Sequence, residues 1–306
     1  MAESRTAVYG ALAANVAITV TKFIVAGITG SSAMLAEGIH SLVDSCNSLL
    51  LLFGEHRSEQ PASATHPFGH GKELYFWSLI VAVLIFGVGG GVSLLEGVLH
   101  VRNPHPLEDP LWNYIVLACA FVFEGASFLL ALRQFTRERG DVPFWKALRT
   151  SKDPATYTVM AEDSAALLGL VIAALGVFFS HRLNMPRVDG MASIAIGLLL
   201  AGVAVLLIRE SRGLLVGEGV SPETAQAMQA IARAEPGVCE VGPVLSMYVG
   251  PEDVLVTFAL DFAPDVPASE VAAAIGRIEQ TVRERFPKVR RIFLEPVRGS
   301  ASVTPA

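Results

Sequence analysis

The chain has 306 residues, a formal net charge of −6, 52% apolar residues and only 17% charged residues. Soluble domains carry about 25% charged residues, so this chain has too few to cover a wholly soluble surface. The positive mean hydropathy of +0.50 agrees with this. The composition excludes a disordered chain, a collagen-like chain and a disulfide-rich secreted fold, and the acidic balance argues against a nucleic-acid partner.

The charge deficit is concentrated in the front of the chain. Of the 23 basic and 29 acidic residues, 21 lie in the last 96 positions, which leaves 31 for the first 210. We therefore predict a transmembrane domain over residues 1–212 and a soluble domain over 213–306. A spanning helix needs about 20 mostly apolar residues, and six stretches qualify: 7–28, 31–53, 74–99, 111–133, 157–180 and 189–209.

Basic residues predict the orientation of these stretches, because loops rich in Lys and Arg stay in the cytoplasm. The connection after the fourth stretch is the richest, with Arg133, Arg137, Arg139, Lys146, Arg149 and Lys152. Both termini should therefore face the cytoplasm. The first stretch is too long for a cleaved signal peptide, and the uncharged link 27–32 predicts a tight antiparallel hairpin with the second stretch.

The last third of the chain has the pattern of a small α+β layer domain. It predicts a helix over 222–234, two β-rich runs over 238–249 and 254–262, an amphipathic helix over 268–286 and a last strand over 289–295. A domain of this size buries too little surface to be strongly stable alone. We therefore expect it to dock or to dimerise.

The second stretch carries three ionisable residues at membrane depth. Glu37, His40 and Asp44 follow one another at steps of three and four in "AEGIHSLVD", so all three lie on one helical face. Ionisable groups inside a membrane are expensive and are functional candidates by default. A neutral imidazole one turn from a carboxylate forms half of a site for a divalent cation.

The fifth stretch carries the adjacent carboxyl groups Glu162 and Asp163 in "VMAEDSAALLG". Helical neighbours are about 100° apart, so the two side chains point in different directions. We expect one of them to help complete a four-ligand site with His40 and Asp44, as zinc prefers, and the other to serve as an outer ligand or proton carrier. The alternative is that these groups only join helices by hydrogen bonds.

Two further features of the apolar stretches concern packing. Lys22 either snorkels to the membrane surface or neutralises a buried carboxylate, and Glu124 is a candidate partner. Gly87, Gly89, Gly90 and Gly91 permit close helix approach, and Gly87 and Gly91 form a small-xxx-small pair.

A second histidine cluster lies in the loop before the third stretch. His66 and His70 are four residues apart in "HPFGHGK", where Pro67 and Gly69 interrupt a regular helix. Two nearby imidazoles suit zinc, but two ligands alone do not make a site. A purely structural role for this loop is the alternative.

Taken together, these motifs resemble the cation diffusion facilitator family. The resemblance rests on "SSAMLAEGIHSLVD", "HPFGHGKEL", the buried Asp of the fifth stretch, "DGMASIAIGLLLAGVAVLLIRES" and the tail ending in "RRIFLEP". It implies an all-α bundle of six transmembrane helices followed by a C-terminal α+β, ferredoxin-like cytoplasmic domain. "EDSAALLG" and "SKDPATYTV" are most similar to the branch that contains mitochondrial zinc transporter 9 and its bacterial relatives.

The resemblance also implies metal ligands and shows where this chain departs from the family. His40 and Asp44 match the ligand pair of the second span, and Asp163 matches the Asp of the fifth span. Val159 stands where the family has a fifth-span His and cannot ligate, so we take Glu162 as its substitute.

Outside the spans the resemblance covers the loop and part of the C-terminal domain. His66 and His70 match two loop ligands, but Ser63 stands where an acidic residue is common. No His follows position 181, so the His-based binuclear site of some members cannot form. We expect the C-terminal domain to be a dimerisation module without a metal-sensing clamp, and we assign Glu37 to the outer ligand shell or proton path.

The resemblance implies a homodimeric, proton-coupled exporter of zinc or a related divalent metal that works by alternating access. Metal ligands must be deprotonated, so metal and protons compete for the same groups. One imidazole with carboxylates suits Zn²⁺ and also accepts Mn²⁺, Fe²⁺ or Co²⁺. We expect the metal as transported substrate, no prosthetic group and membrane lipid as the surroundings.

Two alternatives remain from the sequence. One is a non-transporting membrane scaffold with a decayed metal site, consistent with Val159 and Ser63. The other is an intramembrane metallo-enzyme with Glu162 as general base, which would need an open coordination position. The predominance of Arg over Lys and the lack of a transit-peptide pattern suggest the inner membrane of a bacterium.

Overall fold

The computed structural model describes residues 2–105, 110–140, 143–144 and 154–297. The chain forms two compact units. The first unit comprises Met1–Glu55 and Tyr75–Arg212, and the second comprises His56–Leu74 and Gly213–Ala306. The loop that carries the histidine cluster therefore belongs to the second unit, although its sequence lies between helices of the first.

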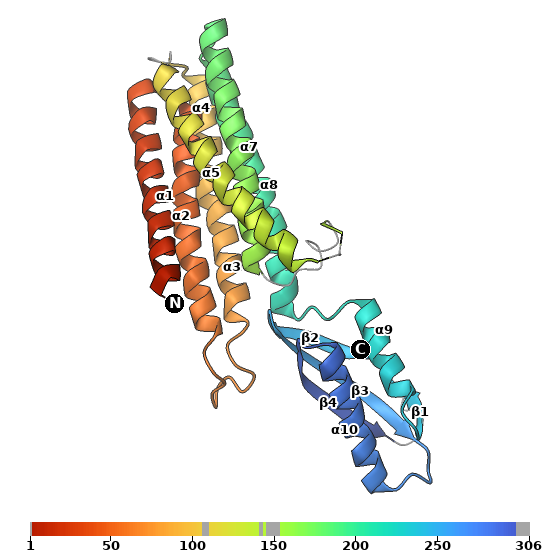
Figure 1. Cartoon of the computed structure of the whole chain (residues 1–306). Coiled ribbons are helices and arrows are strands. Elements are labelled where there is room, and N and C mark those ends of the chain that lie inside the picture. The colour runs from red at the N-terminus through yellow and green to blue at the C-terminus, as the bar shows by residue number, and fades with distance from the viewer. Residues whose placement is uncertain (1, 106–109, 141–142, 145–153, 298–306) are drawn as a thin grey trace. The chain divides into compact units, whose positions relative to one another are not determined.

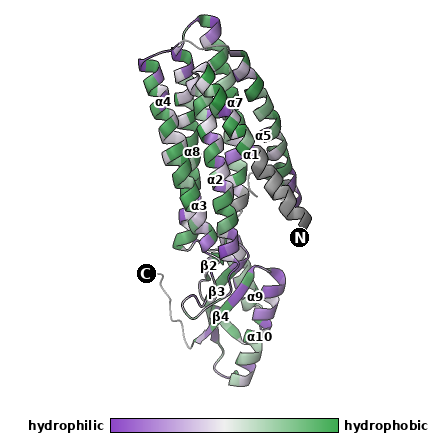
Figure 2. Cartoon of the chain, turned by 90° about the vertical axis from the view of Figure 1, so that its left-hand side faces the viewer, coloured by the Kyte–Doolittle hydropathy of each residue, from purple (hydrophilic) through white to green (hydrophobic). Residues whose placement is uncertain are grey.

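The first unit is a set of long helices that run side by side (Figure 1). Its helices are α1 (Ala2–Thr29), α2 (Ser32–Ser58), α3 (Glu73–Leu84), the π-helical turn η1 (Ile85–Gly90), α4 (Gly91–Arg102), α5 (Pro110–Glu138), α7 (Pro154–Leu183) and α8 (Arg187–Val216). The segments α3, η1 and α4 follow one another without a break. Hydrophobic residues predominate along the coloured parts of these helices (Figure 2).

Four helices in the described part of the chain are long and apolar enough to cross a membrane. They are Glu73–Arg102, Pro110–Arg137, Tyr157–Leu183 and Arg187–Val216. The apolar helix Asn15–Thr29 is shorter, and α2 has the length but buries a polar face. This confirms a membrane protein and leaves the count of six spans a prediction.

The link between α1 and α2 is the tight turn expected from the sequence. Gly30 adopts a left-handed conformation with φ of +67°, which glycine reaches without a steric penalty, and its N–H donates to the Ala26 carbonyl at 2.9 Å. The Ser31 hydroxyl then accepts the Met34 N–H at 3.1 Å. This is an N-cap, so α2 begins directly after the turn.

Close packing of α4 against α8 depends on glycine, but not on the expected pair. A Cβ at Gly97 would lie 2.7 Å from both the Gly190 carbonyl oxygen and the Ile194 nitrogen. Nothing lies within 4 Å of a Cβ at Gly87, and Gly91 meets only the Phe86 carbonyl of its own segment. Of the glycines expected to permit close approach, Gly90 does so, because a Cβ there would lie 3.2 Å from both the Ala201 nitrogen and the Gly197 carbonyl oxygen of α8. Gly87 and Gly91 have no such contact with another helix among the described residues.

The second unit is a two-layer α+β domain. Its elements are α9 (Pro222–Arg233), β1 (Val238–Val241), β2 (Leu245–Gly250), β3 (Asp253–Phe262), α10 (Ala268–Arg285) and β4 (Val289–Val297). Strand β3 is central: β1 and β2 pair antiparallel with its two halves, and β4 pairs with it in parallel. The elements agree with the expected small α+β domain.

The expected single β-run over 238–249 is two strands. Gly242 and Pro243 separate β1 from β2, and the Gly242 carbonyl accepts a hydrogen bond from Gln229 Nε2 of α9 at 2.8 Å. Because Pro243 has no N–H to donate, it cannot continue a ladder in mid-sheet. The single-strand prediction was wrong for this reason.

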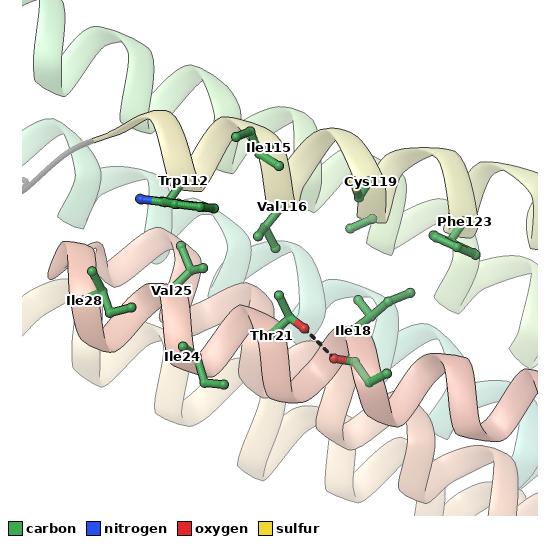
Figure 3. A pocket seen from close by; sticks show the side chains of 12 residues that line it. Ile18, Thr21, Ile24, Val25, Ile28, Trp112, Ile115, Val116, Cys119 and Phe123 are labelled. Carbon is green, nitrogen blue, oxygen red and sulfur yellow. Dashed lines mark hydrogen bonds between the residues drawn. The ribbon is translucent and has the colours of Figure 1, made fainter.

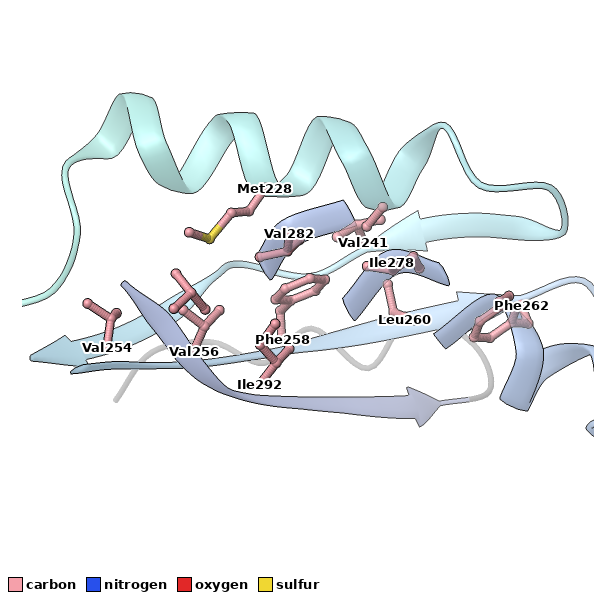
Figure 4. Packing of buried hydrophobic residues seen from close by; sticks show 13 residues of the cluster. Met228, Val241, Val254, Val256, Phe258, Leu260, Phe262, Ile278, Val282 and Ile292 are labelled. Atoms are coloured by element: carbon pink, nitrogen blue, oxygen red, sulfur yellow. The ribbon is translucent and has the colours of Figure 1, made fainter. Parts of the chain in front are cut away.

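The core of the second unit lies between the sheet and both helices. Alternate residues of β3 are buried, which places one face of the sheet against a helical layer. Met228 of α9 and Ile278 and Val282 of α10 pack with Val256 and Leu260 of β3 in this core (Figure 4). All five side chains are fully buried or nearly so.

Candidate metal centre

The polar face of α2 lies inside the first unit, as its spacing predicts. Glu37 is fully buried, His40 is 4% exposed and Asp44 is half-buried. His40 Nε2 is buried and finds no hydrogen-bond partner among the described residues. A ring nitrogen with no partner is available as a metal ligand.

The two carboxyl groups of α7 diverge as the helical geometry requires. Glu162 is buried and lies near Asp44 of α2. Asp163 is half-buried and accepts a hydrogen bond from Ser127 Oγ of α5 at 3.4 Å. The structure thus pairs Glu162 with the α2 face and directs Asp163 toward α5.

Asn47 is a member of this cluster that the sequence reasoning missed. Its Nδ2 donates to Glu162 Oε1 at 2.8 Å, while its Oδ1 is buried without a partner among the described residues. Asn47 is only 1% exposed. The available signal was position, since Asn47 follows Asp44 by three residues and His40 by seven and therefore shares their face.

The predicted ligands do not form a ready-made coordination sphere. In the described ranges, no group of three or more His, Cys, Asp or Glu side chains could hold a metal ion. Asp44 and Glu162 are together, whereas Val159, at the position of the family's fifth-span His, is an apolar side chain that is 36% exposed. The ligand set of His40, Asp44, Glu162 and Asp163 therefore remains a prediction.

The loop histidines are close together, as expected from their spacing. The rings of His66 and His70 have centroids 4.4 Å apart. His66 Nδ1 lies 3.1 Å from Thr65 Oγ1, and His70 Nδ1 lies 3.4 Å from the Gln60 carbonyl oxygen. The pair offers two imidazoles, and its use as a metal site remains a prediction.

Ser63 has a structural task in this loop. Its hydroxyl and its carbonyl oxygen both accept the His66 N–H, at 3.1 and 3.2 Å, and its own N–H donates to the His66 carbonyl at 3.1 Å. These bonds close the turn that presents His66. The serine found in place of an acidic residue therefore orders the loop through its hydroxyl.

Asp189 is a second buried polar residue that the sequence reasoning missed. Its carboxylate, at the start of α8, accepts hydrogen bonds from Ser31 Oγ at 2.7 Å, Ser32 N at 2.6 Å, Ser32 Oγ at 2.9 Å and Ala33 N at 3.2 Å. A carboxylate is favoured at a helix N-terminus by the unpaired N–H groups there. Asp189 thus joins α8 to the start of α2.

An apolar groove of about 570 Å³ lies between α1 and α5 (Figure 3). Trp112, Val116 and Phe123 of α5 face Ile18 and Val25 of α1 across it. Its Thr21 hydroxyl is already bonded to the Ala17 carbonyl at 2.8 Å. The groove is lined by apolar side chains, with Thr21 and Cys119 as the exceptions.

Comparison with known proteins defines the class. The model of the cation efflux transmembrane domain matches residues 8–216. The chain is 32% identical to the human proton-coupled zinc antiporter SLC30A9, mitochondrial, over 90% of this chain and 55% of that protein. It is 31% identical to metal tolerance protein C4 of Arabidopsis thaliana, over 90% of this chain and 61% of that protein.

A bacterial relative is covered more fully. The chain is 30% identical to the magnetosome protein MamM of Paramagnetospirillum magneticum, over 90% of this chain and 85% of MamM. A nickel-form structure of a variant of the MamM C-terminal domain matches 26% of this chain and 100% of that chain, with 14% identity and a TM-score of 0.24. The chain spans about half the length of the first zinc-antiporter relatives.

These matches establish the family that the motifs suggested. The chain belongs to the cation diffusion facilitator family. The matched proteins are transporters and not enzymes, so the metallo-enzyme alternative is not kept.

Proposed function

We propose that this protein exports a divalent metal ion, most favourably Zn²⁺, in exchange for protons. The observation that carries the proposal is the polar face of α2, where His40 Nε2 is buried without a partner among the described residues and Asn47 bonds to the buried Glu162 of α7. Imidazole and carboxylate groups are ligands for Zn²⁺ and also accept Mn²⁺, Fe²⁺ and Co²⁺. The names of the zinc-antiporter relatives support both the metal and the protons.

The membrane arrangement is part of the proposal. We place six spans in the membrane, with α1 and α2 added to the four apolar helices, and both termini in the cytoplasm. The second unit serves as a ferredoxin-like module that joins two copies of the chain into a homodimer. The membrane is the bacterial inner membrane, and His66 and His70 contribute to the metal entry path or to a subunit contact.

Loading of the site displaces protons. His40 binds metal as neutral imidazole, and Asp44, Asp163 and Glu162 bind it as carboxylates, so metal taken from the cytoplasm releases protons there. After the site opens to the other side, protons compete for the same groups and expel the metal. One elementary charge moved through 100 mV is worth about 2.3 kcal/mol. The inward movement of protons therefore supplies the free energy that exports the metal against its concentration gradient.

The test is zinc flux in proteoliposomes with and without an imposed pH gradient, for wild type and Asp44→Ala. We expect gradient-driven flux in wild type and background flux in Asp44→Ala, with both proteins folded. Cys46→Ala is a matched control, because Cys46 lies two residues further along α2 and is exposed. Wild-type flux in Asp44→Ala would contradict the assigned site.

A non-transporting scaffold is the second candidate. It is favoured by the lack of a three-ligand group of His, Cys, Asp and Glu in the described ranges. Absence of zinc, Mn²⁺, Fe²⁺ and Co²⁺ flux in a folded wild-type protein would support it. Competition among these ions in the active wild type would instead identify the preferred substrate.

A further inference from the structure

Lys22 is a fully buried lysine in the C-terminal half of α1, and its side chain contacts α2 and α5. Its ammonium donates hydrogen bonds to Glu37 Oε2 of α2 at 3.2 Å, Ser41 Oγ of α2 at 2.7 Å and Glu124 Oε1 of α5 at 3.0 Å. An ammonium has three protons to donate, so these oxygens satisfy it fully. The side chain therefore neutralises buried carboxylates and does not snorkel.

The three oxygens form a cation-binding cradle, which we call the lysine cradle (Glu37, Ser41 and Glu124). Each of its carboxylates retains one buried oxygen, Glu37 Oε1 and Glu124 Oε2, with no hydrogen-bond partner among the described residues. Divalent cations also bind to oxygen ligands of this kind. Without the ammonium, the cradle would contain two carboxylates whose negative charge is not compensated. Burying such charge destabilises the folded protein.

The lysine cradle adjoins the proposed cargo site. Glu37 precedes His40 by one turn of α2, and Ser41 precedes Asp44 by three residues. The Lys22 ammonium bonds to both Glu37 and Ser41, so the lysine cradle and the ligand pair share one face of α2. Glu37 and Glu124 therefore already hold a cation, the Lys22 ammonium. Asp44 and Glu162 form no ion pair with a Lys or Arg among the described residues.

We propose that Lys22 is the resident cation of a second cation site, and that it prevents the lysine cradle from binding a divalent metal ion. The chain's own ammonium thereby restricts metal in this region to the cargo site. Only the identification of the cargo site rests on the proposed function; the occupancy of the lysine cradle is a separate property. In this proposal Glu37 binds the Lys22 ammonium and takes no part in the proton path.

The experiment is equilibrium binding of radioactive zinc to the purified full-length protein in detergent. We expect Lys22→Gln to bind about one more zinc ion per chain than wild type, because glutamine removes the charge and keeps much of the length. Lys22→Arg, which preserves the cation, should match wild type. Lys22→Gln combined with Glu124→Gln should lose the gain, because the second carboxylate is then absent.

The outcomes separate this proposal from the proposed function. Equal zinc stoichiometry in folded wild type and Lys22→Gln overturns the lysine cradle. A gain in Lys22→Gln that persists when Asp44→Ala is added supports the cradle even if the cargo site is wrong. If Lys22→Gln does not fold, zinc added during purification should restore the folded dimer, and failure of zinc to do so overturns the proposal.

Discussion

Asp189 shows what one carboxylate contributes when it is buried with a complete set of donors. Its two oxygens accept four hydrogen bonds from Ser31, Ser32 and Ala33. Hydrogen bonds to charged groups contribute about 1.5–3 kcal/mol each, and orphaned buried donors add a desolvation cost. We expect Asp189→Ala to lower the stability of the folded protein by about 3 kcal/mol, measured as a lower midpoint of thermal unfolding in detergent.

The conservative variant provides the control at this position. Asp189→Asn keeps one acceptor oxygen in the same place, so its loss of stability should be clearly smaller than that of Asp189→Ala. An unchanged unfolding midpoint in Asp189→Ala would show that the hydrogen bonds between α8 and α2 add nothing to stability.

The cluster of α2 and α7 shows the limit of residue-scale reasoning. Helical spacing predicted that Glu37, His40 and Asp44 share a face, because spacing depends only on the helix. It did not predict that Glu37 belongs to Lys22, or that Asn47 holds Glu162. Those contacts depend on the rotation of α1 and α7 about their own axes, which no local pattern specifies.

At the scale of elements, the close approach of α4 and α8 depends on glycines, which have no side chain between the two backbones. A Cβ at Gly197 of α8 would lie 2.8 Å from the Leu94 nitrogen and 2.9 Å from the Gly90 carbonyl oxygen. Backbone atoms cannot yield as a flexible side chain does. We expect Gly197→Leu to destabilise the fold by about 1–3 kcal/mol through overpacking, measured by thermal unfolding in detergent.

Gly202 is a matched control on the same helix. Nothing lies within 4 Å of a Cβ at Gly202, and leucine has the higher helix propensity. Gly202→Leu should therefore leave the unfolding midpoint unchanged or raise it slightly. Equal destabilisation by both variants would mean that close approach of α4 and α8 is not the cause.

At the scale of whole units, the histidine loop is held by the second unit, to which it belongs. The Arg291 guanidinium of β4 lies 5.2 Å from the centre of the Phe68 ring and donates to the Phe68 carbonyl at 3.1 Å. It also donates to Asp253 Oδ2 at 3.2 Å. A Cβ at Gly71 would collide with the Val249 carbonyl oxygen of β2, so the loop lies directly on the β2–β3 hairpin.

We expect Arg291→Ala to loosen this loop. A cation–π contact at an exposed site is worth about 0.5–1 kcal/mol, which corresponds to about two- to fivefold faster amide exchange in the loop. The informative amides are those of His66 and Gly69, whose N–H groups donate to the Ser63 and His66 carbonyls. Hydrogen exchange followed by mass spectrometry measures both.

Arg290 provides the control, since it is the exposed neighbour of Arg291 on β4. Arg290→Ala removes the same charge and should leave loop exchange at the wild-type rate. Faster exchange in both variants would attribute the effect to net charge. An unchanged rate in Arg291→Ala would show that other contacts, such as Gly71 on the hairpin, hold the loop.

The sequence alone determined the features that depend on local chemistry. Apolar length predicted the membrane helices, the link 27–32 predicted a turn, and the β- and α-type patterns predicted the α+β tail, because each is set by neighbours along the chain. The motifs also identified the family before any comparison. The sequence alone did not locate the break at Gly242 and Pro243, although the cue was local.

Only the tertiary structure decided which polar groups meet. In the structure, Lys22 forms ion pairs with Glu37 and Glu124. Asp189 accepts hydrogen bonds from the start of α2, and Gly97 rather than Gly87 packs against α8. Each result depends on the rotation of whole helices about their axes. That rotation is fixed by packing across the bundle, between residues that lie up to 158 positions apart in the chain.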